Sequence, residues 1–120
     1  MKKLAALSLL LFCKISFAQN IAKINLKDSC IISGGVINLS DFKKLCKICP
    51  SGVTKVNSYV ISYPANPPLY MELRCYKNHW NPKDLIKYAK PGATFMIEEI
   101  DANNSFGQKL NMKSIIIGFK

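Results

Sequence analysis

The pair Cys46-Lys47-Ile48-Cys49 is the clearest candidate for chemistry in this sequence. Two cysteines at this spacing can form a redox-active dithiol when positive charge or a helix N-terminus lowers the pKa of one thiol. We expect the pair at the end of a short helix, where the helix dipole raises a thiol pKa, although Lys44 and Lys47 act in the opposite direction. No thioredoxin-like strand–helix–strand pattern precedes it. A small thiol–disulfide oxidoreductase using Cys46 and Cys49 is therefore the alternative, not the favoured function.

Four cysteines between residues 19 and 120 could instead bind zinc or form disulfides; they are Cys30, Cys46, Cys49 and Cys75. Structural zinc sites generally combine two close cysteine pairs, and this sequence has only one. Disulfides are the usual fate of cysteines in an exported domain. We favour a Cys46–Cys49 bond together with a Cys30–Cys75 bond. A bond from Cys30 to the close pair is the alternative, and Cys75 could also be a free, buried thiol.

His79 and Trp80 are the only histidine and the only tryptophan of the chain. With one histidine and no cysteine nucleophile beside it, a catalytic triad has little support. Trp80 precedes a helix start, Asn81-Pro82, and we expect its side chain to pack into the core. If exposed, Trp80 would be an anchor for a protein partner.

The acidic residues Glu98, Glu99 and Asp101 do not form a convincing carboxylate pair. Adjacent residues of a strand point to opposite faces of the sheet, so Glu98 and Glu99 cannot act together on one substrate. We interpret them as solvated charges. The sequence therefore predicts no catalytic, cofactor-binding or metal-binding residues, and a protein that is not an enzyme.

The first 18 residues have the pattern of a cleavable signal peptide. Lys2 and Lys3 are followed by an apolar run, Leu4 to Cys13, and small residues flank Phe17 before a cleavage point ahead of Gln19. The apolar run is about half the length of the ~20 residues that a membrane-spanning helix needs. We predict export, most simply to the periplasm or else by secretion, with no membrane span afterwards. An uncleaved N-terminal anchor is the alternative.

The remaining 102 residues, 19–120, have the size of one domain. The formal charge of +10 falls to +7 without Lys2, Lys3 and Lys14, which could indicate an acidic partner, an anionic membrane or nucleic acid. Arg74 is the only arginine, however, and arginine is the side chain suited to bidentate phosphate and guanine contacts. We therefore predict no nucleic-acid partner.

Hydrophobic alternation predicts strands over residues 20–26, 36–39, 53–63, 69–76, 95–100 and 112–119. Apolar residues on both faces of 53–63 indicate a central strand, and the alternation of 95–100 slips at Glu98-Glu99, as at a β-bulge. Short helices are expected from a Ser40 cap to Cys49 and from Asn81 to the Pro91-Gly92 stop. Because strands come in runs, we predict a mainly β fold: an antiparallel β-sandwich with one or two short helices.

Two further details concern the predicted packing. The paired glycines Gly34-Gly35 indicate a positive φ, a bulge or a close approach of two backbones. In the strand 69–76, alternate residues are expected to face the core; they are Leu69, Met71, Leu73 and Cys75.

Four segments, in their order, resemble one known family: residues 33–37, 56–63, 89–100 and 107–111. The last three of them, which include Ala89-Lys90-Pro91-Gly92 leading to Ile97-Glu98-Glu99-Ile100, match the family pattern in order and at similar spacing. The pattern is similar to the C-terminal domain of the gliding-motility protein GldM (PorM in related systems), a component of the type IX secretion machinery. The resemblance covers nearly all of residues 19–120.

The resemblance implies an immunoglobulin-like β-sandwich that makes protein–protein contacts in the periplasm without catalysis. In the family this domain is the distal end of a dimeric periplasmic shaft. The expected signal peptide and the four cysteines depart from that pattern, so the shaft role is not carried over. We expect a free-standing exported interaction module, an accessory or paralogue of gliding or secretion components, with an envelope protein as partner. A secreted structural domain that self-associates, for example as a homodimer through an open sheet edge, is a further alternative.

Overall fold

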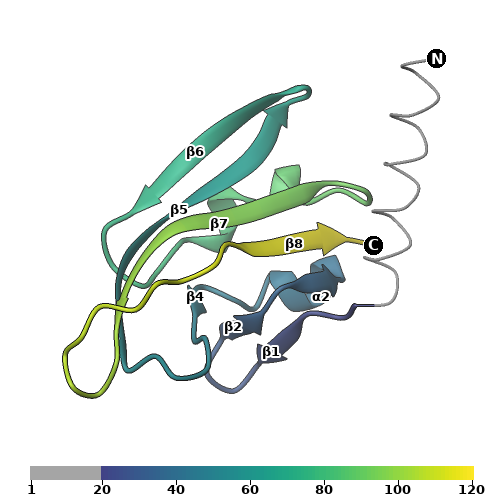
Figure 1. The fold of residues 1–120 in the computed structure, drawn as a ribbon. Coiled ribbons are helices and arrows are strands. Elements are labelled where there is room, and N and C mark those ends of the chain that lie inside the picture. The colour runs from purple at the N-terminus through teal and green to yellow at the C-terminus, as the bar shows by residue number, and fades with distance from the viewer. Residues whose placement is uncertain (1–19) are drawn as a thin grey trace, which may run out of the picture.

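A computed structural model describes residues 20–120 as two β-sheets with short helical segments (Figure 1). The predicted signal peptide, residues 1–18, lies outside the described residues. The smaller sheet has the strand order β1-β2-β4, from β1 (Lys23–Asn25), β2 (Cys30–Ser33) and β4 (Lys47–Ile48). The larger sheet has the order β3-β8-β7-β5-β6, from β3 (Gly35–Ile37), β5 (Lys55–Asn66), β6 (Leu69–Cys75), β7 (Thr94–Asn103) and β8 (Ile115–Phe119).

The pairing is mainly antiparallel, as predicted, but two pairs are parallel. Strand β2 runs parallel to β4, and β3 runs parallel to β8. The helical segments are α2 (Leu39–Phe42) and the 3-10 turns η1 (Pro82–Asp84) and η2 (Ile86–Tyr88). The fold is therefore mainly β with short helices, and β5 is an interior strand between β7 and β6.

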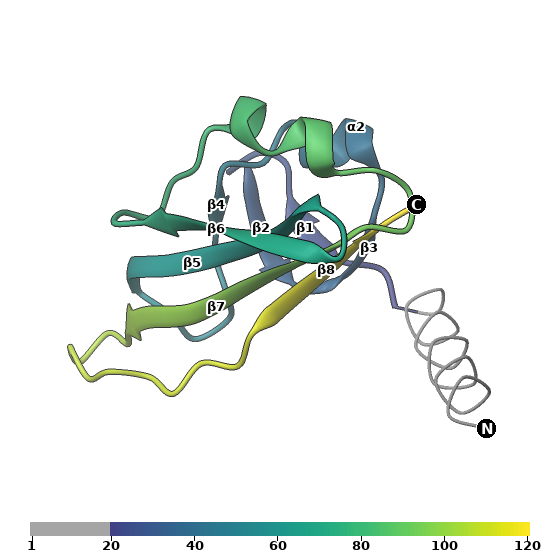
Figure 2. The ribbon, with the colours of Figure 1, turned by 90° about the horizontal axis from the view of Figure 1, so that it is seen from above.

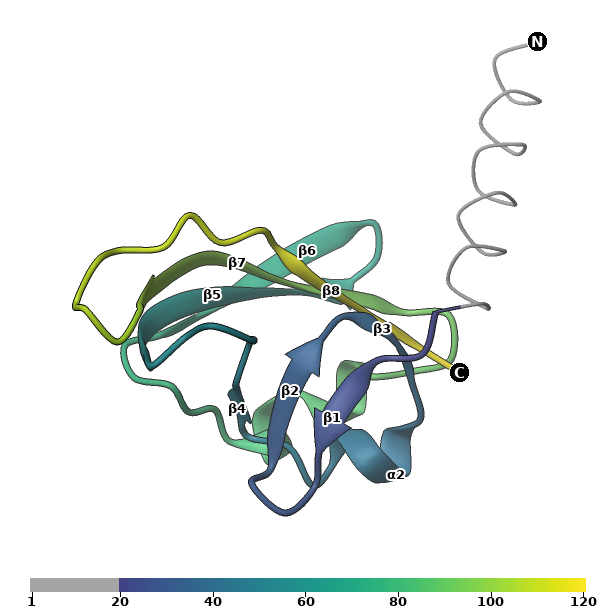
Figure 3. The same ribbon diagram turned by 60° about the horizontal axis from the view of Figure 1, so that its bottom comes forward.

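One face of the larger sheet carries the core. Figures 2 and 3 show the smaller sheet, α2 and the 3-10 turns on the same side of β5, β7 and β8. Five aromatic rings meet in this core, with Phe42 of α2 between the two layers. Its ring centroid lies 5.7 Å from that of Phe95, 5.0 Å from that of Phe119 and 6.4 Å from that of Trp80. Trp80 in turn lies 6.1 Å from Tyr59 of β5. Burial of these rings stabilises the fold, since each aromatic side chain removes about 150–250 Å² from water.

Gly34 and Gly35 allow two close backbone approaches, as the sequence predicts. A Cβ on Gly34 would lie 2.5 Å from the carbonyl oxygen of Ile116 in β8. A Cβ on Gly35, whose φ is +141°, would lie 2.6 Å from the amide nitrogen of Ala22. These contacts bring the chain before β1 and the strand β8 to either side of β3.

The bulge predicted at Glu98-Glu99 is confirmed. Val60 pairs with Glu98 and Ser58 pairs with Asp101, so β7 holds one residue more than β5 over this stretch. Glu99 takes a φ of +50°, which places the extra residue in the left-handed region. The bulge restores the alternation, because Ile97 and Ile100 are both buried.

The helix expected from Ser40 to Cys49 is wrong in its cap and its length. Asn38 is the cap, and its side-chain oxygen accepts the Asp41 amide at 2.8 Å. The helix ends at Phe42, and Lys47–Ile48 form the strand β4 beside β2. Pairing with β2 therefore outweighs the local helical pattern, a common outcome for a short segment.

The second helical segment starts at Asn81 as predicted, and the side-chain oxygen of Asn81 accepts a hydrogen bond from the Lys83 amide at 3.1 Å. It forms two 3-10 turns in place of a regular α-helix. Gly92 then takes a φ of +86° and donates its amide to the Phe119 carbonyl at 2.9 Å. The Pro91-Gly92 corner is thus the point where the helical segment turns onto β7.

Candidate functional site

The cysteines are arranged differently from the favoured pairing. A disulfide joins Cys30 of β2 to Cys49, with their Cα atoms 5.7 Å apart, while Cys46 and Cys75 form no disulfide within residues 20–120. Cys46 and Cys49 flank the strand β4, and three extended residues span about 10 Å. Because a disulfide needs Cα atoms within about 7 Å, an extended segment cannot close a bond between its two ends. The alternative, Cys30 to the close pair, is the arrangement found.

The remaining thiols give little support to redox chemistry. Cys75 is buried on β6, and this burial raises its pKa to about 11, which leaves it protonated and weakly nucleophilic at neutral pH. Cys46 is half-buried, and Cys49 is already bonded to Cys30. An oxidoreductase acting through a Cys46–Cys49 bond would need β4 to unfold first.

Trp80 does not present a surface for a partner. Its side chain is only 3% exposed and packs against Phe42 and Tyr59, so its interpretation as a partner anchor is wrong and its interpretation as a core residue is right. The hydroxyl of Tyr59 and the indole nitrogen of Trp80 are buried without a hydrogen-bond partner among residues 20–120. Burial, with the nearby thiols of Cys75 and Cys46, also raises the pKa of Tyr59 far above its usual value.

The acidic side chains of β7 are dispersed, each with its own partner. Glu98 accepts the Ser62 hydroxyl at 3.4 Å, Glu99 pairs with Arg74 at 3.7 Å, and Asp101 pairs with Lys109 at 3.5 Å. Among residues 20–120, no three His, Cys, Asp or Glu side chains come together as a metal site would require. In the same range, no helix has the length and apolar character to span a membrane.

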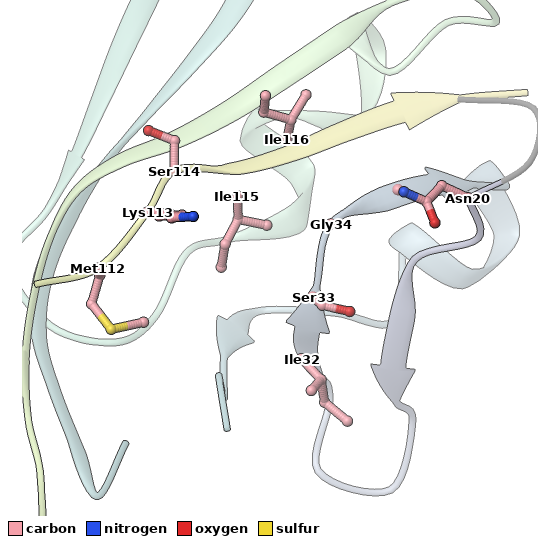
Figure 4. A pocket seen from close by; sticks show the side chains of 10 residues that line it. Asn20, Ile32, Ser33, Gly34, Met112, Lys113, Ser114, Ile115 and Ile116 are labelled. Carbon is pink, nitrogen blue, oxygen red and sulfur yellow. The ribbon is translucent and has the colours of Figure 1, made fainter. Parts of the chain in front are cut away.

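One surface hollow of about 460 Å³ lies beside the glycine pair (Figure 4). Ile32 and Ser33 of β2 line one side of it, and Met112 and Ile115 line the other. Lys113 is the only charged residue of its lining, which contains no acidic or histidine side chain. A single lysine on an apolar wall provides no acid–base pair for catalysis.

A larger groove of about 770 Å³ lies between the β5–β6 hairpin and the Pro91-Gly92 corner. Its wall combines prolines, aromatic rings and two cations: Pro64, Pro67, Pro68, Tyr70, Tyr88, Lys87 and Lys90. The Tyr88 ring lies 4.9 Å from that of Tyr63, and the Lys87 ammonium lies 5.0 Å from the centre of the Tyr88 ring. Aromatic-lined grooves are typical of sites that bind extended, proline-rich protein segments.

The β5–β6 hairpin also carries the apolar surface that the sequence assigns to the core. Leu69, Tyr70 and Met71 are 66%, 49% and 54% exposed, and we call these three residues the hairpin patch. The expectation that Leu69 and Met71 face inward is wrong, because the hairpin projects beyond the layer that covers the sheet (Figure 1). Only Leu73 and Cys75, further along β6, are covered.

The strand that carries the hairpin patch is also an edge. Strand β6 is the last strand of the larger sheet and, among the described residues, pairs only with β5. Its residues from Leu69 to Glu72, and Arg74, are exposed. An unpaired edge with exposed apolar side chains is a template for another strand. The sequence showed the strand but not its position in the sheet, and no pattern in it indicated that the hairpin projects.

Comparisons with family models, curated proteins and solved structures found no match for this chain. The resemblance to the GldM C-terminal domain therefore has no support beyond the short motifs from which it was inferred. The site described above, the open edge of β6 with its hairpin patch, stands on geometry alone.

Proposed function

We propose that this protein is a non-enzymatic, exported protein–protein interaction module, and that its partner binds at the hairpin patch and the open edge of β6. The exposure of Leu69, Tyr70 and Met71 on an unpaired edge strand is the observation that carries the proposal. Natural edge strands usually avoid such exposure with lysine, proline or a covering loop. The seven residues of β6 contain neither lysine nor proline, and Glu72 and Arg74 are the only charged residues among them.

The proposed compartment is the periplasm, with secretion as the other destination of an exported chain. The N-terminal sequence pattern supports export, and the Cys30–Cys49 bond is of the kind that persists in an oxidising compartment. The proposed partner is an envelope protein. The motif order shared with GldM supports a relation to gliding or type IX secretion components, and the two-layer β arrangement supports an immunoglobulin-like sandwich.

The test compares two lysine substitutions of exposed apolar residues. The full chain, with a C-terminal affinity tag, is crosslinked in cells and purified from the envelope fraction. Met71→Lys places a charge on the open edge, whereas Phe106→Lys places the same charge on a distant loop where the side chain is 84% exposed. We expect Met71→Lys to lose a partner that the wild type and Phe106→Lys retain. Equal recovery from all three proteins would contradict the proposed site.

A further inference from the structure

We infer that β6 pairs antiparallel with β6 of a second copy of this chain, with Leu73 on the twofold axis. This inference rests on the proposed function, because it keeps the same edge as the binding site, but it places a second copy of this chain there in place of a different envelope protein. The pairing would join the larger sheets of the two copies into one continuous sheet.

Backbone hydrogen bonding limits which residues of the two β6 strands can face each other. Along an edge strand, the N–H and C=O groups of every second residue point away from the sheet and can bond a second strand. When the two strands are identical, residues that face each other must therefore both have even numbers or both have odd numbers. A twofold axis can therefore pass through a residue of β6, facing its own copy, with neighbours facing each other in reciprocal pairs. The central choices are Met71, Glu72, Leu73 and Arg74.

Charge distinguishes these alignments. An axis through Glu72 brings two carboxylates face to face, and an axis through Arg74 brings two guanidinium groups face to face; like charges directly opposite destabilise a strand pair. An axis through Met71 places Glu72 opposite Tyr70 and leaves the carboxylate without a cation. An axis through Leu73 places Glu72 opposite Arg74 of the second copy, and by symmetry this occurs twice.

The same alignment also matches the flanking residues. Tyr70 faces Tyr76 of the second copy, the residue that directly follows β6, and the two tyrosines are 49% and 78% exposed. Aromatic pairs across strands add stability beyond their buried area. Leu73, which is half-buried, meets its own copy on the axis. Alternate residues of β6 and the residue after it thus present a self-complementary order of tyrosine, glutamate, arginine and tyrosine, from Tyr70 to Tyr76.

The existing contact of Arg74 does not compete with this arrangement. Arg74 lies 3.7 Å from Glu99, and both side chains are more than half exposed, so their pair contributes little to stability. A guanidinium group has five N–H donors and can serve Glu99 and a second carboxylate together. The pairing can therefore leave the Arg74–Glu99 contact in place.

The test is a charge exchange on the full chain, measured by sedimentation over the widest attainable concentration range. Glu72→Arg and Arg74→Glu each replace two attractive pairs with two repulsive ones, and each should weaken dimerisation by about tenfold or more. The double variant restores opposite charges and should recover the wild-type association. Circular dichroism checks folding, which these exposed positions should leave unchanged.

The remaining outcomes separate this inference from the proposed function. A wild type that stays monomeric at every concentration overturns self-pairing, and so does a folded double variant that fails to recover association. If the wild type is monomeric while Met71→Lys still abolishes capture of an envelope protein, the interaction site stands and only its occupant is different. If Met71→Lys changes neither association nor capture, both proposals fail.

Discussion

Removal of the Cys30–Cys49 bond by the double substitution Cys30→Ala/Cys49→Ala should strongly destabilise the fold. The bond joins residues 19 apart in the sequence. Closure of a loop of this size restricts the unfolded chain, and the chain-entropy relation gives about 3 kcal/mol of stabilisation. Since small domains are stable by only about 5–15 kcal/mol, this is a large fraction of the total. With a urea slope of about 1–3 kcal/mol per M, the unfolding midpoint should fall by about 1–3 M.

The matched control is Cys46→Ala, which removes a cysteine of the same motif that is outside the bond. The urea midpoint of Cys46→Ala should stay near that of the wild type. Reduction of the Cys30–Cys49 bond should lower the midpoints of Cys46→Ala and of the wild type by a similar amount. The reduced wild type should resemble the double variant, which shows that the loss comes from the bond and not from the substituted side chains.

Tryptic mapping without reduction identifies the bond directly, because trypsin cleaves after Lys47, between Cys46 and Cys49. The structure predicts a linked pair of the peptides 28–43 and 48–55. A link between peptides 45–47 and 48–55, or a double variant as stable as the wild type, would refute the reasoning about β2 and β4.

Three further substitutions test the packing around the site. Asn78→Ala should lower the free energy of unfolding in urea by about 1–3 kcal/mol. The Asn78 side chain accepts the N–H of Ile48 at 2.9 Å and donates to its C=O at 2.8 Å, and so acts as a strand partner for β4. An unchanged midpoint would contradict this role. Gly34→Ala should destabilise the fold by more than the ~1 kcal/mol expected for Gly107→Ala. A Cβ at Gly34 would clash with the Ile116 backbone, whereas a Cβ at Gly107 meets no atom and is disfavoured only by the positive φ of that residue. Similar losses from the two variants would argue against the close approach at Gly34. Tyr59→Phe should leave the stability at pH 7 unchanged or raise it by about 1 kcal/mol, because it removes a buried hydroxyl without a partner in residues 20–120. The wild type should lose stability above about pH 10, where the unfolded chain ionises a tyrosine that stays neutral when folded, and a pH series on Tyr59→Phe should show a smaller loss.

Local patterns predicted the elements whose causes are local. The Asn81 cap, the Gly92 turn and the bulge at Glu99 each follow from one or two residues whose backbone preferences are strong. The mainly β class follows from the runs of alternating residues. These features need no knowledge of which strands become neighbours.

The sequence failed where long-range pairing decides. The segment Lys47–Ile48 has a helical pattern but joins β2, and this change makes a Cys46–Cys49 bond geometrically unsuitable and directs Cys49 to Cys30. Leu69 and Met71 alternate as core residues do, yet they are exposed because β6 is the last strand and its hairpin projects. The position of a strand in its sheet is set by the whole chain, so the candidate interaction site was not visible in the alternation itself.

Site-specific photocrosslinking in cells tests most directly whether the edge of β6 contacts another chain. A photoreactive side chain replaces Met71 in one version of the full chain and Phe106 in another, both of them exposed positions. The account predicts a defined crosslinked product from position 71, either a dimer of this chain or an adduct with an envelope protein, and none from position 106. Absence of a product at position 71, or the same products from both positions, would contradict it.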